Sequence, residues 1–170
     1  HLAAQAKANT NVGFIGCEPF LNGVAKLLNH IQQHDLLNIR IHDEDARELI
    51  ELMPDSCLAA VYLLYPDPWP KKKHHKRRFV NPENLHHIHR LLQPDGMFYF
   101  ASDIPDYVSW ALVHIRDHGG FEWQARASAD WQTPFAGWVR TRYEGKALVA
   151  GRTPTYLRFQ HREHIRPGYL

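Results

Sequence analysis

The chain has 170 residues, 44% hydrophobic and 22% charged with a net charge of +2, as in a soluble globular protein with one domain over residues 1–170. No apolar run approaches the roughly 20 residues that span a bilayer, so we expect a cytoplasmic protein with no membrane partner. Cys17 and Cys57 lie far apart beside apolar stretches, which predicts reduced core residues.

Short apolar runs alternate with amphipathic segments along the chain. Residues 11–18 (NVGFIGCE) predict a strand, and residues 19–34 predict a helix with Pro19 in its first turn. The continuous apolar run at 58–65 (LAAVYLLY) is typical of a strand buried on both sides of a parallel sheet. Asn81 is expected to open a helix. Further elements are predicted as strands at 37–42, 97–101, 121–127 and 155–160 and helices at 45–53 and 105–118, with a turn at 94–96.

This alternation of strands and helices predicts an α/β fold with a doubly wound, mainly parallel sheet. Such sheets bind ligands beyond the carboxyl ends of their strands. Acidic residues follow four predicted strands in succession, so this edge is expected to form a polar binding site. These acids are Glu18 after the first strand, Asp43 and Asp45 after the second, Asp67 after the third and Asp103 after the fourth.

The sequence PDPWP follows the buried strand at residues 66–70. Its prolines fix the backbone around Asp67 and prevent the chain from continuing as a helix or strand. One carboxylate is thereby held beside one large aromatic side chain, Trp69. A rigid turn with no chemical role would not need that tryptophan, nor the cationic segment behind it.

The cationic segment at residues 71–78 reads KKKHHKRR and holds six of the twenty Lys and Arg residues. The rest of the chain carries fourteen basic and eighteen acidic residues, a net charge of −4. Such a segment is usually a run of charges exposed to solvent, with no binding role. Because this one adjoins a ligand-binding edge and lacks helical apolar periodicity, we expect it to contact phosphates of folded RNA rather than DNA.

Three motifs also have simpler structural interpretations. Glu18 has the position of an acid that binds both ribose hydroxyls, but it could equally cap the helix after it. Residues 141–144 (TRYE) match a capping box. His30 and His34 have the spacing of a zinc pair, but no third ligand is evident, so we expect no metal.

Taken in order, the motifs GFIGCEP, EDA, YPDPWPKKKHHKRR, ASD and TRYE resemble those of the bacterial tRNA (guanine-N7-)-methyltransferases. The block from PDPW to KRR is the most diagnostic, and the resemblance covers residues 3 to 160. It implies a Rossmann-like, class I S-adenosylmethionine-dependent methyltransferase fold, with tRNA as the partner. We expect a monomer or a homodimer.

The resemblance also implies roles for individual residues. Glu18 looks like the acid that holds the cofactor ribose, and Asp45 like the acid near its adenine, with Glu44 assisting. Asp67 resembles the catalytic aspartate and is expected to contact the cofactor as well. Substrate binding is implied for Lys71, Asp103, Thr141, Arg142, Tyr143 and Glu144, and RNA binding for Lys73, His74, His75, Lys76, Arg77 and Arg78.

The chain departs from the family pattern at its start. The family's first strand and glycine-rich loop, which bind the methionine end of the cofactor, are expected immediately before His1. Residues 1–8 resemble the helix that follows that loop. The missing strand would lie between the strands at 12–17 and 58–65, so we expect this 170-residue form to bind S-adenosylmethionine weakly and to have little activity.

The implied reaction is methyl transfer from S-adenosylmethionine to N7 of a tRNA guanine, at position 46 in the variable loop. Two alternatives remain open at this point. One is a non-catalytic RNA-binding relic, which would keep the cationic segment but need no acids at the strand ends. The other is a methyltransferase acting on an exocyclic amino group of a base, because PDPW loosely resembles the acid-Pro-Pro-aromatic motif of such enzymes.

Overall fold

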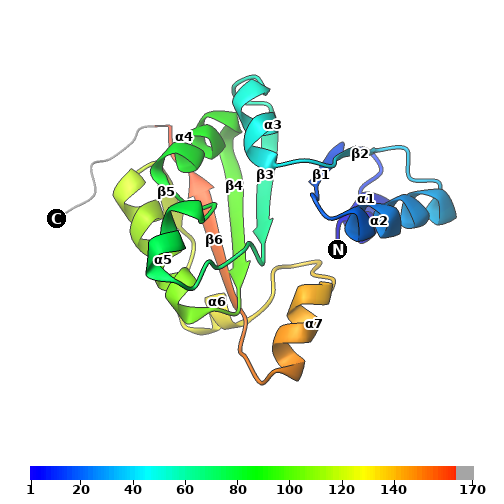
Figure 1. The fold of residues 1–170 in the computed structure, drawn as a ribbon. Coiled ribbons are helices and arrows are strands. Elements are labelled where there is room, and N and C mark those ends of the chain that lie inside the picture. Colours follow the sequence, from blue (N-terminus) through cyan, green and yellow to red (C-terminus); the bar gives the residue numbers. More distant parts are fainter. Residues whose placement is uncertain (164–170) are drawn as a thin grey trace. The chain divides into compact units, whose positions relative to one another are not determined.

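The computed structural model describes residues 1–163 as two compact units (Figure 1). The first unit contains His1–Leu52 and Ala136–Thr141, and the second contains Met53–Phe135 and the described residues from Arg142 onward. Each unit has a core of its own.

The first unit is built on two parallel strands, β1 (Phe14–Cys17) and β2 (Ile39–His42), in register from Phe14 opposite Ile39 to Cys17 opposite His42. Its helices are α1 (Leu2–Ala8), α2 (Leu21–His34) and α3 (Ala46–Leu52). Ala6, Leu36 and Ile39 are its buried core residues. The Asn38 amide donates to the carbonyls of Ala6 and Val12, at 3.0 and 2.9 Å, and so fastens α1 and the approach to β1 onto β2.

The second unit contains a four-stranded sheet in the order β3-β4-β6-β5. Strand β3 (Leu58–Leu64) runs parallel to β4 (Leu92–Ser102), whereas β6 (Thr155–His161) is antiparallel to both β4 and β5 (Phe121–Trp123). The connecting helices are η1 (Lys72–Arg77), α4 (Pro82–Leu91), α5 (Pro105–His118), α6 (Ala129–Gln132) and α7 (Arg142–Val149).

The core of the second unit joins helices α4 and α5 to the sheet. Phe98, Phe100 and Leu157 from β4 and β6 are each at most 1% exposed. They pack in one cluster with side chains of the two helices, including Leu85, Ile88, Tyr107, Ala111 and Ile115. This packing holds the loops that leave the carboxyl ends of β3 and β4 on a rigid base.

Several predicted elements are confirmed. Helix α5 has the predicted bounds, and it ends at Gly119, whose φ of 73° is readily adopted by glycine. Helix α4 begins as predicted, because the Asn81 side chain accepts a hydrogen bond from the backbone N–H of Asn84. The family's helix expected over residues 1–8 is α1.

Other boundaries differ from the prediction for local reasons. Helix α2 starts at Leu21, so Pro19 lies outside it. The turn at 94–96 is an irregularity inside β4, with Asp95 at φ 62°, rather than a break before the strand. Strand β5 ends at Trp123 instead of 127, because the backbone N–H groups of Arg126 and Ala127 donate to the Asp130 carboxylate instead of to a neighbouring strand.

Two burial predictions were wrong. Strand β3 has no fully buried residue, and Tyr62 is 45% exposed, because in the described residues β3 has β4 as its only ladder partner. Cys17 is exposed at the end of β1 and Cys57 is only half-buried; both are free thiols. Cys17 shares the exposed face of β1 with Ile15, as strand alternation requires.

Histidine side chains gather where α4, α5 and β6 meet. The His89 ring lies 4.3 Å from that of His161, 5.2 Å from that of His118 and edge-on to Phe121. His89 therefore packs against other rings, whereas His86 is exposed. Burial, and then the neighbouring His89 and His86, lower the pKa of His118 from 6.5 to about 4.

This pKa shift predicts a pH-dependent stability. Between pH 6.5 and about 4 the unfolded chain binds a proton at His118 that the folded chain does not, so stability should fall as the pH falls through this window. We expect His118→Gln to flatten that decline in urea unfolding, and His30→Gln, on the exposed surface of α2, to leave it unchanged. An equally steep decline in the His118 variant would show that this ring does not cause it.

Candidate active site

The segment that leaves β3 carries Asp67 on a constrained backbone. Tyr65 and Trp69, which flank it, have φ of 53° and 42°, and non-glycine residues adopt this left-handed region only when the surroundings enforce it. The backbone N–H of Tyr65 still donates to the Ala101 carbonyl at 2.8 Å, so the start of the segment remains tied to β4. Asp67 is exposed, and its carboxylate forms no hydrogen bond or ion pair within residues 1–163. It is therefore available to a ligand.

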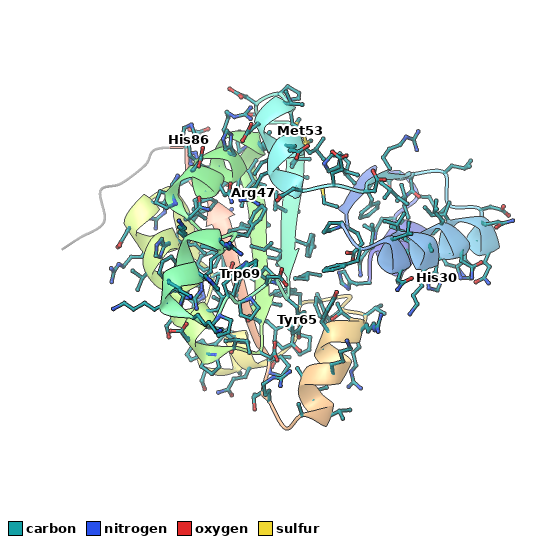
Figure 2. All side chains as sticks on the ribbon, viewed as in Figure 1. His30, Arg47, Met53, Tyr65, Trp69 and His86 are labelled. Atoms are coloured by element: carbon teal, nitrogen blue, oxygen red, sulfur yellow. The ribbon has the colours of Figure 1, made fainter. Side chains whose placement is uncertain are left out.

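Trp69 is packed against the cationic segment. The Arg77 guanidinium lies 4.9 Å from the centre of its ring, and the His74 ring meets it edge-on at 5.9 Å. Figure 2 labels Tyr65 and Trp69 on the second unit. Because cation–π and edge contacts already occupy this ring, the structure favours a supporting role for Trp69 over stacking on a base.

The cationic segment forms η1, a short 3₁₀ helix, and presents its charges unequally. Lys71, Lys73, Lys76 and Arg77 are exposed, as phosphate contact requires. His74 and His75 are half-buried, and the His75 ring packs edge-on against Trp110 of α5 at 5.4 Å. Of the six side chains expected to bind RNA, the three long cations Lys73, Lys76 and Arg77 are thus the most accessible.

Arg78 corrects that expectation. Its side chain is buried, its Nε donates to the Pro68 carbonyl at 2.9 Å, and its Nη2 donates to the Asp106 carboxylate. The guanidinium is used inside the protein and cannot reach an RNA phosphate in this conformation.

Asp103, at the end of β4, is largely buried and paired. Its side chain is 12% exposed, and its Oδ2 accepts a hydrogen bond from Nε of Arg152 at 2.5 Å. Arg152 follows α7, so this ion pair ties the end of that helix to the strand. The carboxylate is held in place, but a ligand must share it with Arg152.

The motif TRYE lies at the start of α7. Glu144 is 4% exposed, and its Oε1 accepts a hydrogen bond from the Tyr156 hydroxyl of β6 at 2.6 Å. Arg142 and Tyr143 are exposed, and the Lys146 ammonium lies 5.8 Å from the Tyr143 ring. Thr141 belongs to the first unit and is half-buried. The structure thus gives the members of this motif different surroundings.

Tyr65 lies beside these residues, because its backbone N–H donates to the Ala101 carbonyl and Ala101 lies opposite Tyr156 in the sheet. Its pKa is raised by burial, and further by the neighbouring Tyr156 hydroxyl and the charges of Glu144 and Asp103. The structure therefore brings together two of the predicted residues, Asp103 and Glu144. No motif in the sequence indicated Tyr65, Tyr156 or Arg152 as members of this cluster. Only the position of Tyr65, directly before PDPW, could have indicated one of them.

In the first unit, the ends of β1 and β2 are neighbours, because Cys17 pairs with His42. The Glu18 backbone N–H donates to the His42 carbonyl at 3.0 Å, and its Oε1 accepts from the Phe20 N–H at 3.0 Å. Its side chain crosses Gly23 so closely that a Cβ there would lie 2.5 Å from Glu18 Cγ. Glu18 thus shapes the approach to α2 but does not cap it, because Phe20 is the N-cap and no side chain bonds the first turn. The other carboxylate oxygen of Glu18, Oε2, lies beside Gly23.

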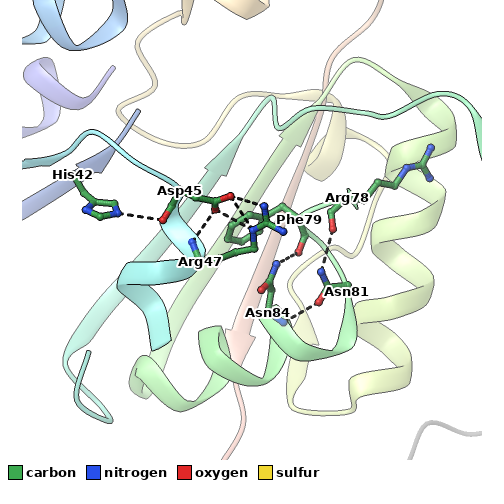
Figure 3. Close-up of polar contacts among 7 residues, drawn as sticks. All are labelled: His42, Asp45, Arg47, Arg78, Phe79, Asn81 and Asn84. Atoms are coloured by element: carbon green, nitrogen blue, oxygen red, sulfur yellow. Dashed lines mark hydrogen bonds and ion pairs between the residues drawn. The ribbon is translucent and has the colours of Figure 1, made fainter. Parts of the chain in front are cut away.

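Asp45 is engaged by Arg47. Both carboxylate oxygens accept hydrogen bonds from the Arg47 side chain, with the shortest at 2.5 Å, and the Arg47 backbone N–H adds a further bond at 3.0 Å. The hydrogen bond from Arg47 lowers the pKa of Asp45. Figure 3 shows this pair and the His42 ring at the Asp45 carbonyl. Glu44, the expected assistant, is exposed.

Within the described residues there is no group of three or more His, Cys, Asp or Glu side chains that could hold a metal ion. His30 and His34 stack with their ring centres 6.3 Å apart. No helix among residues 1–163 has the length and apolar character needed to cross a membrane.

This chain is similar in sequence to known methyltransferases. Residues 1–157 match a family model described as "Putative methyltransferase". The chain is 53% identical to the tRNA (guanine-N(7)-)-methyltransferase of Agrobacterium fabrum, covering 95% of this chain and 70% of that protein. The corresponding protein of Mesorhizobium japonicum is 52% identical, with coverages of 94% and 68%. The chain belongs to the tRNA (guanine-N7-)-methyltransferase family. The resemblance drawn from the sequence motifs is confirmed.

Solved structures confirm the methyltransferase fold. The aminoglycoside resistance methyltransferase NpmB1 matches with a TM-score of 0.57 at 17% identity, over 94% of this chain and 81% of that one. A methyltransferase homologue from Pyrococcus horikoshii gives a TM-score of 0.58 at 12% identity, over 88% and 53%. At these identities the likeness concerns the fold alone, and it supports the predicted α/β class I architecture.

The buried bond between Glu144 and Tyr156 predicts a stability difference. Tyr156→Phe removes a hydrogen bond to a carboxylate, which typically contributes about 1.5–3 kcal/mol. We expect urea unfolding to show a loss of that order. The control Tyr143→Phe changes an exposed hydroxyl on the same helix motif and should alter stability by less than about 0.5 kcal/mol. Equal effects of the two substitutions would contradict the importance of this bond.

Proposed function

We propose that this protein transfers a methyl group from S-adenosylmethionine to N7 of a tRNA guanine, at position 46 of the variable loop, and that Asp67 carries the reaction. The observation that supports this site most directly is the exposed, unpaired Asp67 carboxylate, which lies on a constrained turn immediately before the exposed cations of η1. Family membership supplies the reaction type. A cytoplasmic location belongs to the same proposal, since tRNA is the macromolecular partner.

Guanine N7 has an in-plane lone pair and no proton, so no general base is needed to create the nucleophile. The protein must instead hold N7 in line with the bond that breaks, which is catalysis by proximity and orientation. As the methyl group is transferred, the guanine ring gains positive charge. An ionised Asp67 near the guanine amino and imino protons would bind the ring more tightly as that charge develops.

Substrate binding is proposed for further side chains of the second unit. Lys71 is exposed at the start of the cationic segment, and Arg142 and Tyr143 are exposed at the start of α7. Asp103 and Glu144 are held by hydrogen bonds from Arg152 and Tyr156, and they would supply fixed carboxylates to the site. Lys73, Lys76 and Arg77 would contact tRNA phosphates, with His74 and His75 supporting the loop.

The cofactor side is proposed for the first unit. Glu18 and Asp45 follow the paired ends of β1 and β2, and carboxylates at such positions accept hydrogen bonds from a ribose and from a base. The fit is better for Glu18, of which only Oε1 accepts a hydrogen bond within residues 1–163, than for Asp45, whose two oxygens bind Arg47. When bound, S-adenosylmethionine supplies the methyl group on its sulfonium. The Asp45 carboxylate would then have to bind Arg47 and the cofactor at the same time.

The role of Asp67 predicts a severe loss of turnover in Asp67→Asn. Loss of a charge-stabilising group of this kind typically costs about 10²–10³ in rate, and the exposed position leaves the fold intact. The full-length protein would be assayed on unmodified tRNA, with nucleoside mass spectrometry to identify 7-methylguanosine. Asp117→Asn, an exposed acid on α5 paired with Arg116, should retain normal turnover.

Normal turnover of Asp67→Asn would show that the carboxylate charge is not used. Methylation of an exocyclic amino group instead of N7 would favour the alternative methyltransferase class. Binding of tRNA with no methylated product would favour the non-catalytic alternative.

The exposed cations of η1 predict the salt dependence of tRNA binding. Replacing Lys73, Lys76 and Arg77 by Ala should weaken binding and reduce the slope of log Kd against log salt concentration by roughly 0.7–0.9 for each lost phosphate contact. A triple variant of Lys7, Lys26 and Arg116, which are exposed elsewhere, is the matched control and should keep the slope. An unchanged slope in the η1 variant would identify the segment as a solvated charge run.

A further inference from the structure

Arg78 is the last residue of the cationic segment and the only one of its eight residues that is buried. It is 1% exposed, whereas Lys73, Lys76 and Arg77 face solvent. Removing a guanidinium from water is strongly unfavourable unless hydrogen bonds and opposite charge compensate for it. The buried guanidinium must therefore have partners within the protein that compensate for the lost water.

The contacts of Arg78 join the PDPW turn to α5. Nε donates to the Pro68 carbonyl at 2.9 Å, and Nη2 donates to Asp106 in the first turn of α5. The centre of the guanidinium lies 5.0 Å from the ring centres of both Tyr107 and Trp110. A planar group with several donors can serve all of these partners at once, whereas a lysine ammonium has one charged centre.

The same two aromatic residues fix the chain on the other side of Arg78. The Trp110 indole N–H donates to the Val80 carbonyl at 2.7 Å, and the Val80 N–H donates to the Tyr107 hydroxyl at 3.2 Å. The Asn81 side chain donates to the Arg78 carbonyl at 3.1 Å, as Figure 3 shows. Both the side chain and the backbone of Arg78 are thus anchored.

The Pro68 carbonyl belongs to the peptide that joins Pro68 to Trp69. The φ of Trp69 is 42°, a strained value for a residue other than glycine unless the surroundings hold it. Asp67 comes immediately before Pro68. The hydrogen bond from Arg78 to this carbonyl therefore restricts the backbone next to Asp67, while the Asp67 carboxylate itself remains exposed.

We propose that Arg78 is a positioning residue: it anchors the Pro68 carbonyl to α5 and thereby sets the position of Asp67, and it does not contact tRNA. This inference rests on the proposed function only through the role of Asp67. It separates two tasks within one cationic segment, namely phosphate contact by the exposed cations and alignment of the turn by the buried one.

The test compares Arg78→Lys with Arg77→Ala in the full-length protein. Misplacement of a catalytic group by about 1 Å can cost about 10²-fold in rate, so we expect Arg78→Lys to lower kcat by tenfold or more. Its salt slope for tRNA binding should match that of the unaltered protein. Arg77→Ala should instead lower the slope by roughly 0.7–0.9, whereas Lys7→Ala, at an exposed cation of α1, should change neither the slope nor kcat.

A second measurement reads the turn without relying on catalysis. In protein labelled with 5-fluorotryptophan, the Trp69 resonance, assigned with Trp69→Phe, should shift or broaden in Arg78→Lys and stay in place in Lys73→Ala. Asp106→Asn, at a largely exposed side chain, keeps the fold and should give a smaller change of the same kind. Together these variants remain informative even if a more drastic substitution of Arg78 unfolds the protein.

A reduced salt slope with normal kcat in Arg78→Lys would overturn the proposal and identify Arg78 as an RNA contact. Unchanged kcat and an unchanged Trp69 resonance would overturn it as well. Failure of the proposed function appears differently. In that case Asp67→Asn would remain active, while the Trp69 resonance would still respond to Arg78→Lys.

Discussion

The parallel pairing of β3 with β4 is the constraint on which the site in the second unit depends. The register from Ala60 opposite Met97 to Leu64 opposite Ala101 makes both strands end at the same edge of the sheet. The segment that carries Asp67 and the loop that carries Asp103 therefore emerge together. Strand β6, antiparallel to β4, brings Tyr156 opposite Ala101 near the end of β4, and the Tyr156 hydroxyl donates to Glu144 of α7.

Charge is divided between two tasks in this unit. The exposed cations of η1 form a surface suited to a polyanion. The carboxylates of Asp103 and Asp106 are instead engaged by Arg152 and by Arg78. Asp67 differs from both, because no side chain in the described residues pairs with it. A carboxylate left unpaired beside a strongly cationic segment keeps its charge available to a substrate, which is the physical basis for the proposed role of Asp67.

The acids of the first unit show how local hydrogen bonds compete with ligand binding. Glu18 and Asp45 follow paired strand ends as the sequence predicts, yet each already accepts hydrogen bonds from the chain segment that follows it. Such side chain to backbone bonds are typical of acids near helix starts. A local structural role and a ligand-binding role of Glu18 are therefore compatible, because one carboxylate oxygen can bond the Phe20 N–H while the other serves a ligand.

The sequence by itself determined the fold class, the family, most of the helices and strands, and the place of Asp67 in a constrained turn. These features depend on short-range patterns: apolar periodicity, proline positions, and capping residues such as Asn81. The sequence could not show that Arg78, one of six cations in eight residues, is buried while its neighbours are exposed. That distinction depends on Asp106, Tyr107 and Trp110, which lie about 30 residues away and approach Arg78 only when α5 packs.

Tertiary structure also decided that Arg152 pairs with Asp103 and Tyr156 with Glu144, and that β3 and Cys17 are more exposed than their apolar surroundings predict. In each case the reason is the same: burial and pairing of a charged or polar group are set by partners that the fold brings together, and not by neighbours along the chain.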